Sequence, residues 1–388
     1  MDRITKTIHK QTNDLGESHA SPIWLTSAYN FESAEIAERR FTGKENGYIY
    51  SRFTNPSVTE LEDKIAILEN AESAICFASG MATYTAIALT FLKQGDEVLI
   101  AGGVFGSTSV LIRNIFSKFG ITSKLLPPYE VETWTNHITK NTRLIIIETP
   151  SNPLMLVYDI NKIKSQIPEY ILLVIDNTIL TPIFQLPIKS GADLVINSLG
   201  KYFDGQGRVV AGAVAGNHNL INQLLQVQRS TGLTLGAFEA WVLSAGADTL
   251  DIRMKTHQKN ALFLAEQLNQ HEMIEKVFYT GIEQKNNIIS KQQLGFGGLL
   301  SFKIKTDLVG TMKFINSLNL IRICTNIGGD RSIITHPATT THCKYSLEER
   351  KAFGIDDNLV RLSVGLENPI DIFNDLNSAL IQLKNPDC

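Results

Sequence analysis

The sequence contains few cysteines and no long apolar run, and each of these absences excludes certain classes of protein. Its four cysteines are Cys76, Cys324, Cys343 and Cys388, and none of them belongs to a CxxC or zinc-type spacing. We therefore expect reduced thiols and no metal site. No stretch approaches the roughly 20 apolar residues of a membrane span, and MDRITKTIHKQTND lacks the apolar core of a signal sequence. These features predict a cytoplasmic protein without a membrane partner.

The net charge is also small. It is -3 at neutral pH, so there is no electrostatic reason to expect nucleic acid or an anionic membrane as a partner. Apolar residues make up 43% of the 388 residues, which is ordinary for a globular protein with a large core. Because this length exceeds the usual size of one domain, we expect two large units with separate cores.

Short apolar runs rich in β-branched residues alternate with helical segments in the first part of the chain. The runs are SAICF, DEVLIAG, TSKLLPP, RLIIIETP, ILLVIDNT and DLVINSLGK. Continuously apolar runs are typical of parallel strands that are buried on both faces, so the pattern predicts an α/β doubly wound sheet. In such a sheet the ligand binds at the carboxyl ends of the strands.

The pattern changes after about residue 250. A long helical stretch over 249–271 is followed by the strand-like runs KVFYTG, GGLLSFKIK and LVRLSVG and by two further helical segments. This arrangement predicts a smaller α+β domain. We therefore expect an aromatic-rich N-terminal arm over 1–52, a large domain over 53–248 and a C-terminal domain over 249–388.

Polar residues gather where the predicted strands end. Gly80 precedes a helix, Asp176 ends an apolar run, and Ser198 and Lys201 follow another. Each has an ordinary structural explanation: a capped turn around Gly80, a helix cap at Asp176 and a solvated charge at Lys201. Together they supply a helix N-terminus with free N–H groups, a fixed carboxylate and an amine, which are the parts that a pyridoxal phosphate site needs.

A nucleotide site of the ordinary kind is less consistent with the same segment. It would require a glycine fingerprint such as GxGxxG after the first strand, where this chain has SGMAT. In a pyridoxal phosphate site the lysine forms a Schiff base with the aldehyde, and the acid keeps the ring nitrogen protonated so that the ring can accept carbanion electrons.

Several segments, in order along nearly the whole chain, carry a resemblance to one family. They are YSRFTNPSVTELE, FASGMAT, ETPSNPL, VIDNT followed by LTP, SLGKY, HPATTTH and RLSVGLEN. The chain resembles the pyridoxal-phosphate enzymes of cysteine and methionine metabolism, the cystathionine γ-synthase family. Within it, SPIWLTSAYNFESA, VFGST, YFDGQGR and TNIGGDRSIITHPATTTH are most similar to the O-succinylhomoserine sulfhydrylases. The resemblance implies an aspartate-aminotransferase-like (fold type I) large domain and pyridoxal 5'-phosphate as the cofactor.

The resemblance also implies which residues hold the cofactor. Lys201 would form the Schiff base and transfer protons, Asp176 would pair with the pyridine nitrogen, and Phe105 would stack on the ring. The phosphate would be bound by Gly80, Met81 and Ser198, and by Tyr50 and Arg52 of a neighbouring subunit.

The substrate and the oligomeric state follow from the same resemblance. Arg361 would bind the α-carboxylate of the substrate as a bidentate fork, assisted by Asn152 and Asn326. Without the resemblance, an ion pair at the surface or between domains would be the simpler explanation of Arg361. If Tyr50 and Arg52 complete a neighbour's site, the smallest active unit is a dimer, and the family implies a homotetramer built of two such dimers.

Two positions depart from the usual family pattern, and a third differs from one of its branches. Phe105 stands where most members have a tyrosine, so the stacking face is kept and a hydroxyl is lost. Gly200 stands where a threonine usually precedes the lysine, and the loss of one hydrogen bond to a charged group, worth about 1.5–3 kcal/mol, predicts weaker retention of the cofactor. Ser107 stands where methionine γ-lyases typically have a cysteine. The sequence suggests no role for Arg208.

The implied reaction is a γ-replacement on an activated homoserine ester. The freed Lys201 amine would remove the α-proton, a second deprotonation at the β-carbon would expel succinate, and sulfide would add at the γ-carbon to give homocysteine. Lysine suits these steps because its pKa falls readily in a dry or positively charged pocket. The alternatives are cystathionine γ-synthase, O-acetylhomoserine sulfhydrylase and methionine or cystathionine γ-lyase, and, in another class, a pyridoxal-phosphate-binding protein without turnover.

Overall fold

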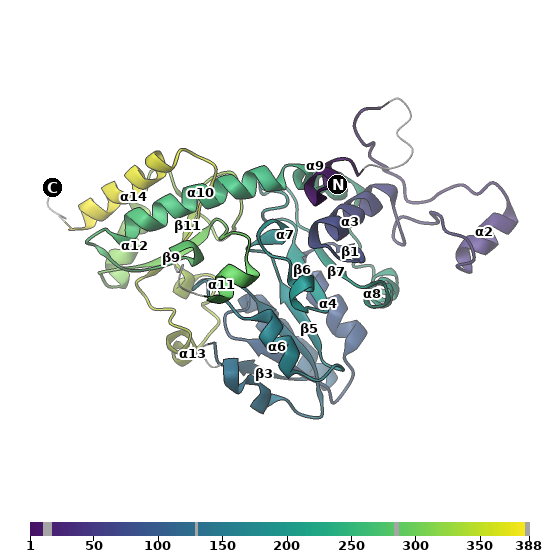
Figure 1. Cartoon of the computed structure of the whole chain (residues 1–388), viewed down its shortest axis with the longest axis horizontal. Coiled ribbons are helices and arrows are strands. Elements are labelled where there is room, and N and C mark those ends of the chain that lie inside the picture. Colours follow the sequence, from purple (N-terminus) through teal and green to yellow (C-terminus); the bar gives the residue numbers. More distant parts are fainter. Residues whose placement is uncertain (11–17, 129–130, 283–286, 385–388) are drawn as a thin grey trace.

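The computed structural model describes residues 1–10, 18–128, 131–282 and 287–384 (Figure 1). Its larger sheet has seven strands in the order β1-β7-β6-β5-β4-β2-β3. The strands are β1 (Ser73–Phe77), β2 (Glu97–Ala101), β3 (Thr122–Leu126), β4 (Thr142–Glu148), β5 (Leu172–Asp176), β6 (Leu194–Ser198) and β7 (Gly212–Gly216). Only β7 runs antiparallel to its neighbours, so the predicted α/β fold with a mainly parallel sheet is confirmed.

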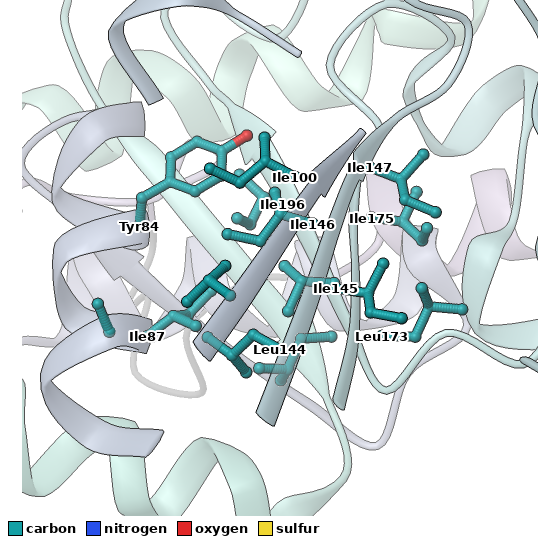
Figure 2. Packing of buried hydrophobic residues seen from close by; sticks show 14 of the residues in the cluster. Tyr84, Ile87, Ile100, Leu144, Ile145, Ile146, Ile147, Leu173, Ile175 and Ile196 are labelled. Atoms are coloured by element: carbon teal, nitrogen blue, oxygen red, sulfur yellow. The ribbon is translucent and has the colours of Figure 1, made fainter. Parts of the chain in front are cut away.

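The central strands are buried on both faces, as their continuous apolar runs predict. Figure 2 shows Tyr84 and Ile87 of α4 (Gly80–Phe91) on one side of the strands, and Ile147 and Ile175 on the other. These side chains belong to one core cluster in which most members are less than 5% exposed. Because successive residues of a strand point to opposite faces, such a strand must be apolar at every position.

The remaining helices of this part of the chain cover the sheet. They are α3 (Pro56–Glu69), α5 (Gly106–Val110), α6 (Ile160–Gln166), α7 (Thr181–Phe184), α8 (His218–Thr231) and α9 (Ala237–Asp248). The side chain of Asn55 caps α3 by accepting the Ser57 N–H at 2.9 Å. A second core cluster joins α3 and α9 to the sheet, through side chains such as Leu61 and Leu243.

The C-terminal part of the chain forms its own sheet. The elements are α10 (Leu250–Asn269), β8 (Ile274–Phe278), α11 (Asn287–Gln292), β9 (Leu299–Ile304), α12 (Leu308–Asn316), β10 (Arg322–Ile323), β11 (Ile333–Thr335), α13 (Leu347–Ala352), β12 (Leu359–Ser363) and α14 (Pro369–Lys384). The strand order is β10-β11-β12-β9-β8, and all pairs except β10 with β11 are antiparallel. Helices α10 and α14 pack over this sheet around a separate core.

The N-terminal segment differs from the rest in how little it buries. Helix α1 (Arg3–Ile8) packs on α3 and α9, whereas α2 (Ala34–Phe41) has no buried residue and projects away from the body of the molecule (Figure 1). Cys76, Cys324 and Cys343 form no disulfide, and Cys388 lies outside the described residues. Among the helices that the structure describes, none combines the length and the apolar character needed to cross a bilayer.

Candidate active site

A cavity of about 220 Å³ lies at the carboxyl ends of β4, β5 and β6 and at the start of α4. It is lined by Ser79, Gly80, Met81, Tyr84, Phe105, Glu148, Asn152, Asp176, Thr178, Ile196, Ser198, Lys201, Val210, Thr325, Ile327 and Arg361. The strand-end rule therefore located the cavity from the sequence. The cavity collects most of the expected site residues from segments that lie far apart in the chain.

The start of α4 lines the cavity where the phosphate is expected to bind. Ser79 caps the helix through its side chain, and the helix begins at Gly80. The first N–H groups of a helix have no partner within it, so those of Gly80 and Met81 are available to an anion. A Cβ added at Gly80 would lie 3.1 Å from the Ser198 hydroxyl oxygen, which places that hydroxyl beside the same helix end.

Asp176 ends β5 with its carboxylate buried. One oxygen accepts the Tyr84 hydroxyl at 2.6 Å, and the other accepts the Thr178 N–H at 2.9 Å. Burial raises the pKa of Asp176, because removal from water disfavours the ionised form. The bond to Thr178 is a local contact of the kind that a helix cap makes. The bond to Tyr84 joins the other oxygen to a residue that lines the cavity.

Lys201 follows β6 in the chain and lines the cavity. Its ammonium group donates to the side-chain oxygen of Asn326. Burial lowers the pKa of Lys201, and the nearby positive charge of Arg361 lowers it further. Asn326 therefore contacts the lysine through its side chain, and its predicted contact with the substrate carboxylate stays a prediction.

Arg361, on β12, reaches the same cavity and is 2% exposed. Its guanidinium donates to Asn152 Oδ1 at 3.2 Å, to the Thr325 carbonyl at 2.9 Å and to the Asn326 carbonyl at 3.2 Å. Burial lowers the pKa of Arg361 to about 10, while the charge of Glu148 opposes this shift. Among the described residues Arg361 makes no ion pair, and its Nε has no acceptor, so the guanidinium has a free donor for a ligand.

Glu148, at the end of β4, is a further buried acid beside the site. Its Oε2 accepts the backbone N–H of Phe105 at 2.8 Å, and this bond ties the segment that carries the aromatic ring to the sheet. Burial, and then the negative charge of Asp176, raise the pKa of Glu148 well above its usual value. Phe105 itself is 37% exposed and lines the cavity.

A second and larger hollow opens beside the first. Its volume is about 470 Å³, and it shares Phe105, Lys201 and Thr325 with the smaller cavity. Ser107 and Lys344 contribute to its wall. We call this hollow the outer chamber. Lys201 thus lies at the boundary between the two spaces.

Tyr50 and Arg52 are not brought to this site within one chain. Tyr50 is 42% exposed, and the Arg52 guanidinium donates to the Arg229 carbonyl and lies over the rings of Tyr50 and Phe53. Neither residue lines the cavity. Their predicted contact with a neighbouring subunit's phosphate therefore stays a prediction.

Close packing explains the unusual Gly200. A Cβ at this position would lie 2.5 Å from the Val209 carbonyl oxygen, which is closer than real Cβ contacts. The returning chain thus occupies the space in which a threonine side chain would begin. Arg208, which follows the same turn, donates through Nε to Asp204 Oδ1 at 2.8 Å, and this ion pair closes the loop after Lys201.

Sequence reasoning missed Tyr84, and it noted Glu148 and Thr178 at strand ends without giving them a role. Tyr84 lies four residues after Gly80 on α4, so its helical spacing already placed it on the cavity side. Glu148 and Thr178 stand at strand ends, where the sequence also placed the other polar candidates. Thr178 accepts the Ser198 N–H at 2.9 Å and thereby links the ends of β5 and β6.

The chemistry of these groups fits pyridoxal phosphate. The buried Asp176 carboxylate has only neutral donors among the described residues, and a protonated ring nitrogen would supply the missing cation. The α4 N-terminus fits the phosphate, and Lys201 fits the aldehyde. The unpaired Nε of Arg361 fits the carboxylate of an amino acid.

Comparison with known proteins agrees with this geometry. The chain is 40% identical over 368 residues to O-succinylhomoserine sulfhydrylase of Pseudomonas aeruginosa, with 94% of this chain and 91% of that protein covered. It is also 40% identical over 384 residues to L-methionine gamma-lyase of Fusobacterium nucleatum subsp. polymorphum, with 97% of each covered.

The structural comparison points to the same kind of protein. A crystal structure from Campylobacter jejuni subsp. jejuni that contains N'-pyridoxyl-lysine-5'-monophosphate has a TM-score of 0.93 and 31% identity, with 98% of this chain and 100% of that chain covered. The model of the family described as Cys/Met metabolism PLP-dependent enzyme matches residues 4–381. The chain therefore belongs to the pyridoxal-phosphate-dependent enzymes of cysteine and methionine metabolism.

Proposed function

We propose that this enzyme catalyses γ-replacement on O-succinylhomoserine with sulfide, which yields homocysteine and succinate. The family supports γ-elimination or γ-replacement on small amino-acid substrates, and its members include both a sulfhydrylase and a γ-lyase among the relatives described above. The choice between them rests on the space and the groups around Lys201.

The outer chamber of about 470 Å³ beside Lys201 is the main support for this proposal. Its volume adds to the 220 Å³ of the inner cavity, so a substrate with a bulky γ-substituent has room beyond the reacting carbons. A methyl thioether would leave most of this space to water. The Ser107 side chain, in the wall of the chamber, also differs from the cysteine that is typical of methionine γ-lyases.

Arg361 is the group we assign to substrate orientation. Its Nε is buried without an acceptor, and Asn152 holds one of its other nitrogens at 3.2 Å. A bidentate bond from this guanidinium to the α-carboxylate would fix the amino acid with its α-carbon toward Lys201. The simpler explanation of Arg361, an ion pair at the surface or between domains, has no support among the described residues.

Lys201 is the group we assign to proton transfer. Pyridoxal phosphate, when bound, supplies an electrophilic carbon for the amino group and a ring that accepts the electrons of the carbanion. The lowered pKa of Lys201 increases the share of neutral amine near neutral pH, which a general base requires. Asn326 accepts from the amine and holds it at the boundary between the cavity and the outer chamber, within reach of both the α- and the β-carbon.

The remaining polar groups hold the cofactor. We assign Asp176 to the ring nitrogen, Phe105 to the ring face, and Gly80, Met81 and Ser198 to the phosphate. Glu148 positions Phe105 through the bond to its N–H. The absence of a hydroxyl on Phe105 leaves proton transfer to Lys201.

An assay with two donors and two acceptors tests the proposed function. O-succinylhomoserine and O-acetylhomoserine are each combined with sulfide and with cysteine, and the product, homocysteine with sulfide or cystathionine with cysteine, is quantified by mass spectrometry. The proposal predicts the highest kcat/KM for the succinyl ester with sulfide. A preference for cysteine would assign a cystathionine γ-synthase instead, and release of a 2-oxo acid from methionine at a higher rate would assign a γ-lyase.

We further propose the assembly and the domain division. The exposed Tyr50 and the arm that carries it, which projects from the body in Figure 1, support a dimer in which each arm completes the neighbouring site, and two such dimers would form a homotetramer. One core cluster lies wholly within 53–248 and another wholly within 249–388, and these two support a cofactor domain and a C-terminal domain with those bounds. A further cluster joins the two domains, and the proposed arm covers 1–52.

A further inference from the structure

The outer chamber contains a second lysine, Lys344, besides Lys201, whose amine is assigned to the cofactor and to proton transfer. Its wall also contains the thiols of Cys324 and Cys343 and the phenol of Tyr345. No aspartate or glutamate of the described part of the chain belongs to this wall. A ligand with a negative charge that faces away from Arg361 is therefore the kind of molecule the chamber suits.

The charge of Lys344 is available to such a ligand. Lys344 is exposed, and the described residues give it no ion pair. Glu349 lines a neighbouring hollow together with Lys344, but its carboxylate accepts from Arg113 at 3.2 Å and from the Ser346 N–H at 2.9 Å. Glu349 is thus already engaged, and no other acid of the described segments forms an ion pair with the ammonium group of Lys344.

The backbone that carries Lys344 is held in place by the turn that precedes it. The Thr340 hydroxyl donates to the His336 carbonyl at 2.6 Å. The Tyr345 N–H donates to the His342 carbonyl at 3.2 Å, and the ring of Tyr345 stacks on that of His342 at 5.8 Å. The side chain of Lys344 therefore starts from a fixed point at the chamber wall.

We propose that Lys344 binds the carboxylate at the far end of the substrate's acyl group. This inference rests on the proposed function, because it takes Arg361 as the anchor of the α-carboxylate. The acyl group then extends past Lys201 into the outer chamber, whose wall includes Phe105 and Tyr345. A charge-assisted bond to Lys344 selects a dicarboxylic acyl group, such as succinyl, over a neutral one, such as acetyl.

The first test compares the two esters in the holoenzyme with the Lys344→Gln substitution. The ratio of kcat/KM for the succinyl ester to that for the acetyl ester is expected to fall about tenfold, which is the loss of one bond to a charged group, and most of the fall is expected in KM. Lys351→Gln is the matched control, since Lys351 is an exposed lysine of α13 that does not line the chamber. An unchanged ratio in Lys344→Gln would overturn the inference, even if the wild type makes homocysteine from the succinyl ester.

The second test measures binding without turnover. Succinate is titrated into the wild-type holoenzyme and into both variants, and binding is followed by saturation-transfer NMR of the succinate methylene protons. Weaker succinate binding in Lys344→Gln, with unchanged binding in Lys351→Gln, supports the carboxylate site even if the reaction proves to be an elimination. Equal binding by all three proteins contradicts it.

Discussion

At the scale of single residues, the buried acids determine how the strand ends are held. Glu69 lies at the end of α3 and is 0% exposed. Its Oε1 accepts from Asn177 at 3.1 Å and from Asn197 at 2.6 Å, and these two residues neighbour Asp176 and Ser198 in sequence. Burial raises the pKa of Glu69 to about 7.

This pKa predicts a pH-dependent stability. Because the folded-state value exceeds the unfolded value of 4.5, the folded protein binds more protons between these two values, and the stability from protonated Glu69 is lost as pH rises through about 7. Glu69→Gln keeps an acceptor for both asparagines and stays neutral. We expect it to match the wild type near pH 5 and to exceed it by about 3 kcal/mol at pH 8, since one pKa unit is worth about 1.4 kcal/mol.

Urea denaturation at fixed protein concentration, repeated from pH 5 to pH 8, checks this prediction. The informative quantity is the difference in the free energy of unfolding between Glu69→Gln and the wild type, which removes the contributions of all other titrating groups. A difference that stays constant across this pH range would show that Glu69 is ionised in the folded protein throughout.

The sequence predicted the residues of the site better than their contacts. Lys201, Asp176 and Gly80 were found because they follow apolar runs, and strand ends meet at one edge of a parallel sheet. Asn326 could not be placed on Lys201 in advance, because that contact joins segments 125 residues apart. The reason for a glycine at position 200 could not be predicted from the sequence either, since it depends on the path of the Val209 backbone.

At the scale of elements, the position of the turn before α4 depends on close packing against β7. Gly212 opens β7, and a Cβ added there would lie 2.5 Å from the Ser79 carbonyl and 2.7 Å from Gly80 Cα. Both of these atoms belong to the backbone, so rotation of a side chain cannot relieve the overlap. The absence of a side chain at Gly212 is therefore what allows the proposed phosphate-binding turn to lie against the sheet.

Gly212→Ala is expected to displace this turn and to weaken the binding of pyridoxal phosphate at least tenfold, with a loss of stability of about 1–3 kcal/mol. Titration of the apoprotein with the cofactor, followed by absorbance, measures the affinity. Gly329→Ala is the control, because a Cβ there would meet nothing within 4 Å. An unchanged cofactor affinity in Gly212→Ala would separate this turn from the phosphate site.

The elements themselves were the most predictable part of the fold. The runs RLIIIETP and ILLVIDNT became β4 and β5 because strands that are buried on both faces require apolar residues at every position. The antiparallel direction of β7 was not predicted. Its sequence, GAVAG, consists of small residues, and they allow close approach to the turn before α4 without indicating a direction.

At the scale of the whole molecule, the described residues of the N-terminal arm contribute nothing to the cavity of their own chain. The proposed dimer predicts that a site combines Lys201 of one subunit with Arg52 of the other. Co-expression of the Lys201→Ala and Arg52→Ala chains tests this arrangement, provided that each substitution alone abolishes activity. Random pairing in a two-fold dimer should then restore about one quarter of the wild-type activity, because each mixed dimer contains one intact site.

The same experiment distinguishes the alternative arrangement. If Tyr50 and Arg52 served their own chain, a mixed dimer would contain no intact site, and co-expression would give no more activity than the two parents. Sedimentation of the single variants provides the control, since both must assemble as the wild type does for the comparison to hold.

If Lys201 and Arg361 perform a γ-replacement, the reaction of O-succinylhomoserine with sulfide must show it in its product balance. The holoenzyme is incubated with both substrates, and succinate, homocysteine and 2-oxo acid are quantified together. We expect homocysteine in equal amount to succinate, a minor amount of 2-oxo acid, and neither product from Lys201→Ala. Succinate released with an equal amount of 2-oxo acid and ammonia, or no succinate at all, would contradict this expectation.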